Sequence, residues 1–369
     1  MADNLRLVPL SHVKEDYILG KTIYDGQGRV LLMKGVFLRS SLVQKLKELG
    51  YSSVYINDGL SIGEIEDIIK PQIRQKAVST LSKVISDMAK LSEEKPDEST
   101  AKILKEKTYK NVDNLRDISS EIVNELMVRK DVMVNLVDIK SSDNFTYAHS
   151  VNVAVLSLVL GISLSLNRYE LYDLALGALL HDIGIIFVPK EIARRRKSLN
   201  DEELTKYKLH TSKGYEHLGK IKSVKPVVKV IVLQHHEQVD GKGYPLGFGG
   251  SKINKLVKIV SIADSYDILT SSVDNEVPVP PHEALEYMMG DGGQKFDFDM
   301  VSEFIKKIVP YPVGTMVRLS SNDIGIVNHV NTDFPWRPTV TIVKGGKLNN
   351  TINLLEAQNI TILGIQYSF

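Results

Sequence analysis

The sequence predicts a mainly α protein: a central helical bundle with a small α/β domain before it and a small β-rich domain after it. Apolar residues recur three or four positions apart through the middle of the chain, whereas short β-like runs separated by turns occupy both ends. The length of 369 residues, with 43% hydrophobic and 25% charged residues, suits several packed domains. We place the predicted domains at residues 1–60, 61–137, 138–306 and 307–369.

The first predicted domain, residues 1–60, alternates β-like runs with turns, as a small α/β regulatory domain does. We expect Asp25–Gly28 to form the turn of a hairpin and Gly50 to follow the end of a helix. The predicted elements are a hairpin of Lys21–Tyr24 with Arg29–Met33, a helix capped by Ser40 or Ser41, and a strand over Ser53–Ile56.

The segment 61–137 is predicted to be a connector of long, charged, amphipathic helices. Its apolar residues between Val78 and Met88 recur at helical spacing, and Pro71 and Pro96 divide it into pieces. An ordinary scaffold pair of helices and a dimerising or signal-carrying helix both fit this pattern. A homodimer is therefore a candidate assembly.

The last segment, 307–369, is predicted to form a small twisted sheet or barrel. Its β-like runs are Met316–Leu319, Ile324–Val330 and Thr339–Val343. Trp336 beside Arg337 has two interpretations, a binding edge or a packing residue, and packing is the commoner role of a single aromatic residue.

Charge and composition limit the kinds of partner and site. The formal net charge of +1 gives no overall attraction for polyanions, so we expect no DNA or RNA partner and only local basic groups for a nucleotide. The chain has no cysteine, which leaves histidine, aspartate and glutamate as metal ligands. Charges interrupt the N-terminal apolar residues, and we find no apolar run long enough to span a membrane. We expect a soluble, cytoplasmic protein.

Two carboxylates interrupt apolar helix faces in the central segment. The face that includes Leu171 and Leu179 runs directly into His181–Asp182, and the stripe from Leu256 to Ala263 surrounds Asp264. A buried carboxylate without a partner is costly, and a bound metal ion would neutralise it. The two aspartates therefore indicate a metal site.

Histidines at similar positions strengthen this interpretation. A lone helical histidine is usually structural, but several of them together with two aspartates can converge in the core of a helical bundle. Imidazole and carboxylate are suitable ligands for iron, manganese or zinc, and such a site points to metal-assisted hydrolysis. The five histidines are His149, His181, His210, His235 and His236, and His217 is a sixth, less well placed.

The order of these motifs resembles that of the HD-GYP family, a branch of the HD-domain metal-dependent phosphohydrolases associated with hydrolysis of cyclic di-GMP. The resemblance covers roughly residues 138–273. A bare His-Asp pair is weak evidence, but the ordered set is specific. Its elements are TYAHSVNVA around His149, GALLHDIG around His181, His210 followed by Gly214, HHEQVDGKGYPLG from His235, and IVSIADSYDILTS around Asp264.

The resemblance implies an HD-type helical bundle holding two divalent metal ions, iron or manganese. It also favours a helix for Val227–Ile231, where periodicity alone leaves helix and strand open. Some family members bind a third metal through a glutamate, but Phe145 stands at that position here, so we expect two. The implied ligands are His149, His181, Asp182, His210, His235, His236 and Asp264, with Asp182 bridging and with His181 and Asp182 central to catalysis.

Two departures from the family pattern concern the substrate. Ile185 stands where a lysine usually follows the HDIG motif, and residues 268–280 lack the usual Arg-rich segment. Loss of a phosphate-directed cation should weaken binding or catalysis. Candidate substitutes for substrate binding are Lys190, Arg194 in the run Arg194–Lys197, Lys242 and Tyr244, although a solvated basic run and a loop of fixed shape are the plainer interpretations.

The resemblance implies a phosphodiesterase in which a metal-bridged hydroxide opens a cyclic dinucleotide, cyclic di-GMP first, to a linear product. The alternative is a slow or inactive metal-bearing sensor that signals through its flanking domains, which the two departures favour. A third hypothesis, an HD hydrolase acting on another phosphate ester, fits the metal ligands but not the GYP motif. A GGDEF-type or other signalling protein is a candidate partner.

Overall fold

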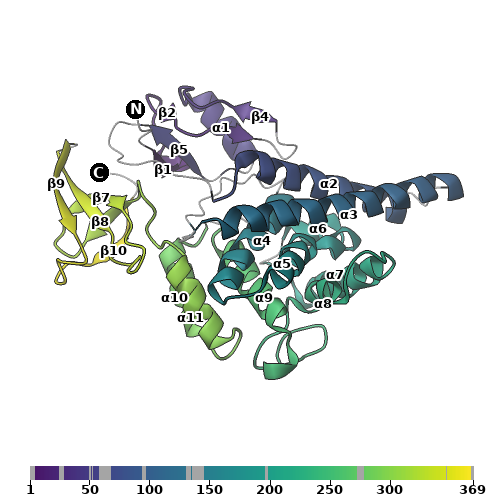
Figure 1. The fold of residues 1–369 in the computed structure, drawn as a ribbon. Coiled ribbons are helices and arrows are strands. Elements are labelled where there is room, and N and C mark those ends of the chain that lie inside the picture. Colours follow the sequence, from purple (N-terminus) through teal and green to yellow (C-terminus); the bar gives the residue numbers. More distant parts are fainter. Residues whose placement is uncertain are drawn as a thin grey trace.

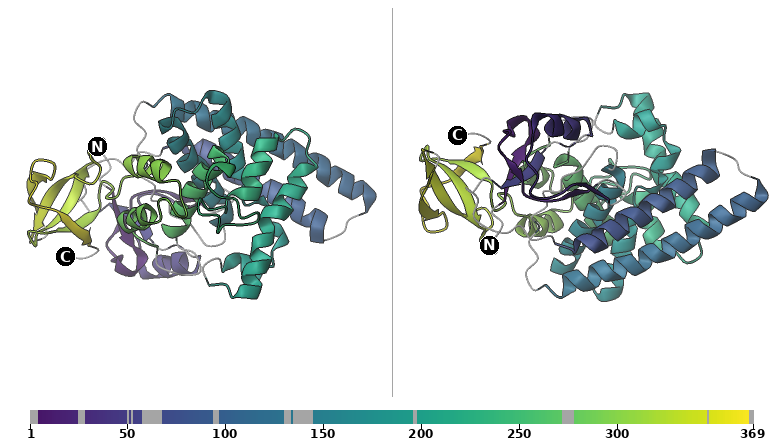
Figure 2. Two further views of the ribbon diagram at one scale, coloured as in Figure 1. Left: turned by 90° about the horizontal axis from the view of Figure 1, so that it is seen from below. Right: turned by 90° about the horizontal axis from the view of Figure 1, so that it is seen from above.

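The computed structural model describes residues 5–24, 29–49, 51, 53–57, 68–93, 97–129, 134, 145–195, 198–271, 278–345 and 347–366. The protein is mainly α, with small sheets near its two termini, as the sequence predicts. In both Figure 1 and Figure 2 the C-terminal sheet lies at one end of the helical body and a long pair of helices extends toward the opposite end.

The N-terminal domain has a three-stranded sheet in the order β1-β5-β2 and a separate hairpin of β3 and β4. The predicted hairpin, helix and last strand are confirmed, but the predicted serine cap is wrong. Ser40 is the first residue of the helix rather than its cap, and its hydroxyl donates to Glu15. The elements are β1 Arg6–Pro9, β2 Ile18–Leu19, β3 Ile23–Tyr24, β4 Val30–Leu32, α1 Ser40–Glu48 and β5 Ser53–Asn57. The predicted turn and Gly50 lie outside the described residues.

The connector forms two long helices, α2 (Pro71–Glu93) and α3 (Glu98–Met127), which pack against each other (Figure 2). Pro71 is the first residue of α2, where a missing N–H costs nothing, and Asp97 caps α3 by accepting from the Thr100 N–H. Their buried apolar faces belong to the same core as the central bundle. This helical hairpin is therefore a packed wall of the bundle.

The central bundle carries most of the buried apolar residues of the chain. The segment Val227–Ile231 is helical, as expected. The elements of the bundle are α4 Phe145–Ser163, α5 Arg168–Leu180, the 3-10 helix η3 Ile183–Phe187, α6 Lys190–Arg194, α7 Asp201–Gly219, α8 Pro226–Gln234, α9 Lys255–Leu269, α10 Pro281–Gly290 and α11 Phe298–Lys307. Helix α4 packs against α5 and α9, and α7 packs against η3 and α8.

Helix α4 corrects one expectation from the sequence. The window Thr146–Ser163 is long and apolar enough, by length and composition, to cross a membrane. However, 72% of that window is buried inside the protein, where α4 contacts α5 and α9. Its apolar character serves the core of the bundle.

The C-terminal domain is an antiparallel five-stranded sheet in the order β10-β6-β7-β8-β9. The three predicted strands are confirmed, and β9 and β10 were missed. The strands are β6 Met316–Leu319, β7 Ile324–His329, β8 Thr339–Lys344, β9 Lys347–Asn353 and β10 Ile362–Ile365. The half-buried Trp336 packs against both this sheet and the helical core, with its ring edge-on to Tyr311 at 6.2 Å. The packing interpretation of Trp336 is confirmed.

Candidate metal centre

Six elements of the bundle bring the seven predicted residues together. His149 lies on α4, His210 on α7 and Asp264 on α9, whereas the others stand at helix ends. His181 directly follows α5, Asp182 directly precedes η3, and His235 and His236 directly follow α8. The side chains form two groups, in each of which the ligand atoms lie within 4.8 Å of one another: Asp182, His210, His235 and His236, and His149, His181 and Asp264.

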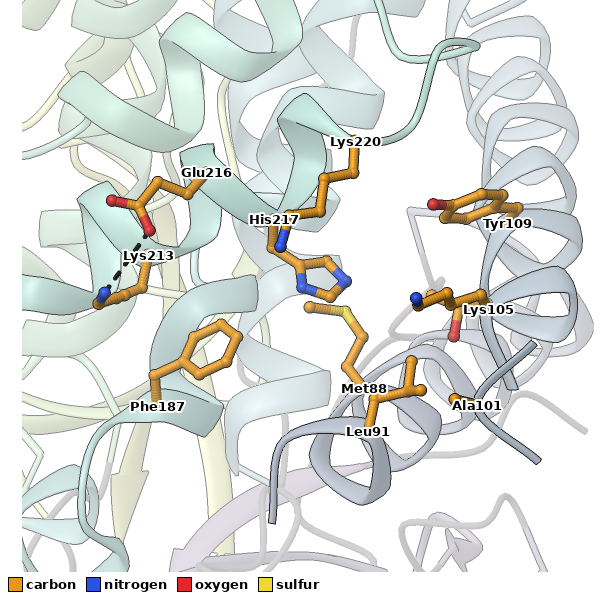
Figure 3. Close-up of a pocket in the computed structure, with 11 residues that line it drawn as sticks. Met88, Leu91, Ala101, Lys105, Tyr109, Phe187, Lys213, Glu216, His217 and Lys220 are labelled. Atoms are coloured by element: carbon orange, nitrogen blue, oxygen red, sulfur yellow. Dashed lines mark ion pairs between the residues drawn. The ribbon is translucent and has the colours of Figure 1, made fainter. Parts of the chain in front are cut away.

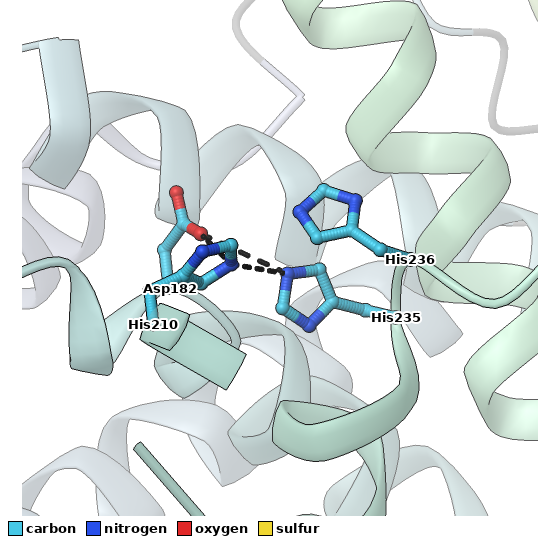
Figure 4. A group of neighbouring side chains, drawn as sticks. All are labelled: Asp182, His210, His235 and His236. Carbon is cyan, nitrogen blue, oxygen red and sulfur yellow. Dashed lines mark hydrogen bonds and ion pairs between the residues drawn. The ribbon is translucent and has the colours of Figure 1, made fainter. Parts of the chain in front are cut away.

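The carboxylate of Asp182 faces both groups. Its Oδ1 lies 3.4 Å from His210 Nε2 and 3.8 Å from His235 Nε2 (Figure 4). Its Oδ2 lies 3.7 Å from His181 Nε2 and 3.9 Å from His149 Nε2. One carboxylate thus presents an oxygen to each group, the arrangement that a bridging ligand requires.

The carboxylate of Asp264 also lies close to histidines of both groups. Its Oδ1 lies 3.0 Å from His149 Nε2 and 3.6 Å from His181 Nε2, and its Oδ2 lies 3.9 Å from His236 Nδ1. Asp264 is only 3% exposed, so it has lost nearly all contact with water. A bound cation would compensate for burying two carboxylates in one place.

Backbone carbonyls orient three of the imidazole rings. The Nδ1 atoms of His181, His210 and His235 each lie within 3.0 Å of the carbonyl oxygen three residues earlier in the chain. A carbonyl oxygen can only accept, so each Nδ1 carries the proton and donates it. The lone pair of each Nε2 is then directed toward the centre, which is the tautomer a metal ligand needs.

Burial sets the charge state of the histidines. It lowers the pKa of His235 well below its usual value and the pKa of His236 to about 3, so both rings are neutral at neutral pH. Burial alone would also lower the pKa of His181, but the carboxylates of Asp182 and Asp264 outweigh it and raise that pKa. The neutral rings of His235 and His236, beside the carboxylates, are suitable metal donors.

Two ring nitrogens of this set lack a hydrogen-bond partner. Within the described residues, neither His181 Nε2 nor His236 Nε2 is hydrogen-bonded, although both are buried. Buried polar atoms are normally paired, so these two fit a ligand that would approach from the centre. The buried histidine and aspartate groups therefore indicate a site for divalent metal.

A chain of polar contacts behind His149 was not assigned a role from the sequence. Asp267 Oδ2 lies 2.7 Å from His149 Nδ1, and its Oδ1 accepts from Asn152 Nδ2 at 3.0 Å. Asn152 in turn accepts from Arg74 Nη1 at 2.6 Å. Asp267 follows Asp264 by one helical turn, a spacing visible in the sequence, but both of its partners come from α4, and Arg74 of α2 contacts one of them, Asn152. The chain connects the helical hairpin to a ring of the metal centre.

The loop after His236 is shaped by its backbone and by Glu237. Gly241 has a positive φ of +81°, and a Cβ on Gly243 would lie 2.4 Å from the Gln238 nitrogen. Both carboxylate oxygens of the buried Glu237 accept backbone N–H groups, from Leu246 at 2.7 Å and from Phe248 at 2.9 Å. The Tyr244–Pro245 peptide bond is cis.

This loop places Tyr244 against the metal centre. The ring of Tyr244 stacks on His236 with centroids 4.7 Å apart, and Lys208 Nζ lies 5.1 Å from the centre of the Tyr244 ring. Lys208 precedes His210 by two residues on α7, and no motif in the sequence singles it out. An aromatic ring and an ammonium group therefore lie together beside the histidines.

The other predicted substrate residues lie at the surface or outside the described part. Lys190 is exposed at the start of α6, and Lys242 is 78% exposed and pairs with Asp240 at 3.2 Å. The side chains of Arg194 and Phe145 and the residues 196–197 and 272–277 lie outside the described residues. The roles of these residues stay predictions.

Ile185, which replaces the expected lysine, lies in an apolar cluster. Its side chain is 7% exposed and packs with Val188, Ile192 and Tyr207. Tyr207 also contacts the ring of His210, with centroids 4.8 Å apart. This position therefore supports the wall behind His210.

Part of the chain is similar to known proteins. Residues 131–300 match the family model described as HD domain. The chain is 34% identical over 211 residues to cyclic di-GMP phosphodiesterase PA4108 of Pseudomonas aeruginosa, covering 57% of this chain and 51% of that protein. It is 28% identical over 222 residues to cyclic di-GMP phosphodiesterase PdeB of Borreliella burgdorferi, covering 60% and 58%. The chain thus spans about half the length of these curated relatives.

Among solved structures, the fold is similar to that of Bd1817, an HDG"Y"P protein from Bdellovibrio bacteriovorus. The TM-score is 0.50 at 20% sequence identity, and the match covers 81% of this chain and 98% of that chain. At this identity the likeness concerns the fold alone.

Proposed function

Because residues 131–300 form an HD domain that carries HD-GYP motifs, we propose that the protein is a metal-dependent phosphodiesterase that opens a cyclic dinucleotide to a linear product. Cyclic di-GMP is the substrate we favour, since the two relatives described above are named for it. The observation that carries the proposal is the Asp182 carboxylate with one oxygen toward each group of histidines.

We propose that the seven residues hold two ions, with Asp182 shared. His149, His181 and Asp264 would hold one, and His210, His235 and His236 the other. Iron or manganese suits this set of imidazole nitrogens and carboxylate oxygens, which contains no thiolate. When bound, such a pair of ions supplies an activated water and neutralises charge on the phosphodiester oxygens.

The chain itself would orient the substrate. We propose that Tyr244 stacks on a base or packs against the ribose, and that Lys208 beside it attracts a phosphate. Lys208 would then supply the cation that Ile185 does not. Lys190, Arg194 and Lys242 stay candidates for outer phosphate contacts.

The cysteine-free chain is compatible with a reducing cytoplasm, where we propose that the protein acts.

A weakly active or inactive sensor is the second candidate function. It is favoured by the burial of Ile185 in an apolar cluster at the position where a phosphate-directed lysine is expected. Such a protein would bind metal and nucleotide, and binding would change the conformation of its flanking domains. A GGDEF-type or other signalling protein would be its partner.

One experiment distinguishes the phosphodiesterase from the sensor. The protein is purified anaerobically with iron or manganese, its metal content is measured, and cyclic di-GMP, cyclic GMP-AMP and bis(p-nitrophenyl) phosphate are assayed for binding and turnover. Turnover of a cyclic dinucleotide at two ions per chain is the expected result. Tight binding without turnover would select the sensor, and turnover of the simple diester alone would refute a cyclic dinucleotide as substrate.

A further inference from the structure

A pocket with a volume of about 640 Å³ lies between the helical hairpin and the end of α7. None of the seven residues of the metal centre lines it (Figure 3). Its walls come from α2, α3, α7 and the end of η3. Its size lies within the range of pockets that bind small molecules.

One part of this pocket is apolar and aromatic. Phe187, at the end of η3, and His217, on α7, have ring centroids 6.0 Å apart. Met88 and Leu91 of α2 contribute their apolar side chains on the side of the hairpin (Figure 3). This part suits a planar, weakly polar group.

The other part of the pocket is cationic. Lys105 reaches in from α3, and Lys220 follows α7 beside the His217 ring (Figure 3). Neither lysine forms an ion pair with any residue that the structure describes, whereas Lys213 pairs with Glu216 at 3.5 Å. Two ammonium groups are therefore available for an anion.

His217 adds a neutral hydrogen-bonding group between these two parts. Burial, together with the positive charge of Lys220, lowers its pKa to about 4. The ring is uncharged at neutral pH and can donate one hydrogen bond and accept another.

We propose that this pocket binds a small organic anion that carries an aromatic or heterocyclic ring. The ring would lie against Phe187, His217 and the apolar side chains of α2, and the anionic group would lie between Lys105 and Lys220. The proposal stands apart from hydrolysis at the metal centre, because it uses none of the seven residues. The pocket nevertheless shares two elements with the metal centre. The helix η3 begins beside Asp182 and ends at Phe187, and α7 carries both His210 and His217.

The test uses 8-anilinonaphthalene-1-sulfonate, an aromatic anion whose fluorescence rises on binding, titrated into the full chain. We expect saturable binding to the wild type and at least tenfold weaker binding to the double variant Lys105→Ala/Lys220→Ala. The matched control is Lys107→Ala/Lys222→Ala, which removes two exposed lysines close in sequence that do not line the pocket. The control should bind as the wild type does.

A second variant tests the cavity without changing charge. Ala101 is half-buried in the first turn of α3, and Ala101→Phe would fill the pocket from that side. We expect this variant not to bind the probe, while its circular dichroism spectrum matches that of the wild type. Equal binding by all four proteins, or no saturable binding by the wild type, would overturn the proposal.

Discussion

At the scale of single residues, Asp182 is the side chain on which both groups of the centre depend. Its two oxygens face different histidines, so its loss removes a donor from each group at once. His181 belongs to one group only, but its buried Nε2 lies within 3.7 Å of both aspartates and has no hydrogen bond within the described residues.

We therefore predict that His181→Ala and Asp182→Ala both lose metal and activity. Changes at residues that merely support a ligand cost about 10–100-fold in metal affinity or activity, and a lost donor should cost at least that much. Metal analysis of anaerobically purified protein checks the first part and turnover the second. Wild-type metal content in both variants would contradict the assignment.

Ile185 offers a test of the missing cation. Ile185→Lys should raise the affinity for substrate or the rate, if a phosphate-directed charge limits the enzyme. Because the position is 7% exposed, the substitution should also destabilise the fold by about 1–3 kcal/mol. Ile185→Met, similar in length but uncharged, is the control. Equal KM and kcat for both variants would show that another group, such as Lys208, already supplies the charge.

At the scale of elements, the contact between η3 and α7 fixes the distance from Asp182 to His210. A Cβ on Gly184 would lie 1.9 Å from the carbonyl oxygen of His210 and 2.6 Å from the nitrogen of Gly214. Both obstacles are backbone atoms, which cannot rotate away. Gly184 is needed for this close packing rather than for a left-handed backbone conformation, because its φ is not positive.

We predict that Gly184→Ala separates η3 from α7 and weakens metal binding together with stability. Overpacking of this kind typically costs about 1–3 kcal/mol. Gly219→Ala is the matched control: it lies on α7 with open space around its Cβ and should leave metal content unchanged. Urea unfolding and metal analysis measure the two effects, and equal metal retention by both variants would refute the role of this contact.

Elements with strong periodicity were predictable from the sequence, and those shaped by distant partners were not. The amphipathic α2 and α3 follow their local patterns, whereas the apolar α8 was predicted only through the family resemblance, because its pattern fits a strand equally well. Strand β9 is polar and largely exposed, without the alternation that marks a strand, and β10 has four residues. In the site, ordered motifs pointed to all seven residues that the structure brings together. The roles of Asn152 and Arg74 depend on contacts between segments far apart in the chain.

At the scale of the whole molecule, the helical hairpin is coupled to the metal centre by a polar chain as well as by a shared core. Arg74 of α2 donates to Asn152 of α4, and Asn152 donates to Asp267, which holds His149. A shift of α2 along its axis would therefore act on the orientation of one imidazole.

We predict that Arg74→Met weakens metal binding by up to about tenfold, because it removes an outer support of that ring. Lys76→Ala, two residues away on the exposed side of α2, removes only a pair with Glu121 and is the control. Competition with a chelator measures the affinity of both variants. An unchanged affinity in Arg74→Met would mean that the hairpin does not act on the centre through this route.

Trp336 is the one tryptophan of the chain, and it touches both the sheet and the helical body. Its emission spectrum is consequently a native reporter of the joint between these two parts, free of background from any other indole. A shift to longer wavelength would signal that water has reached the joint, and a change seen on adding metal or nucleotide would reveal long-range communication without any label attached.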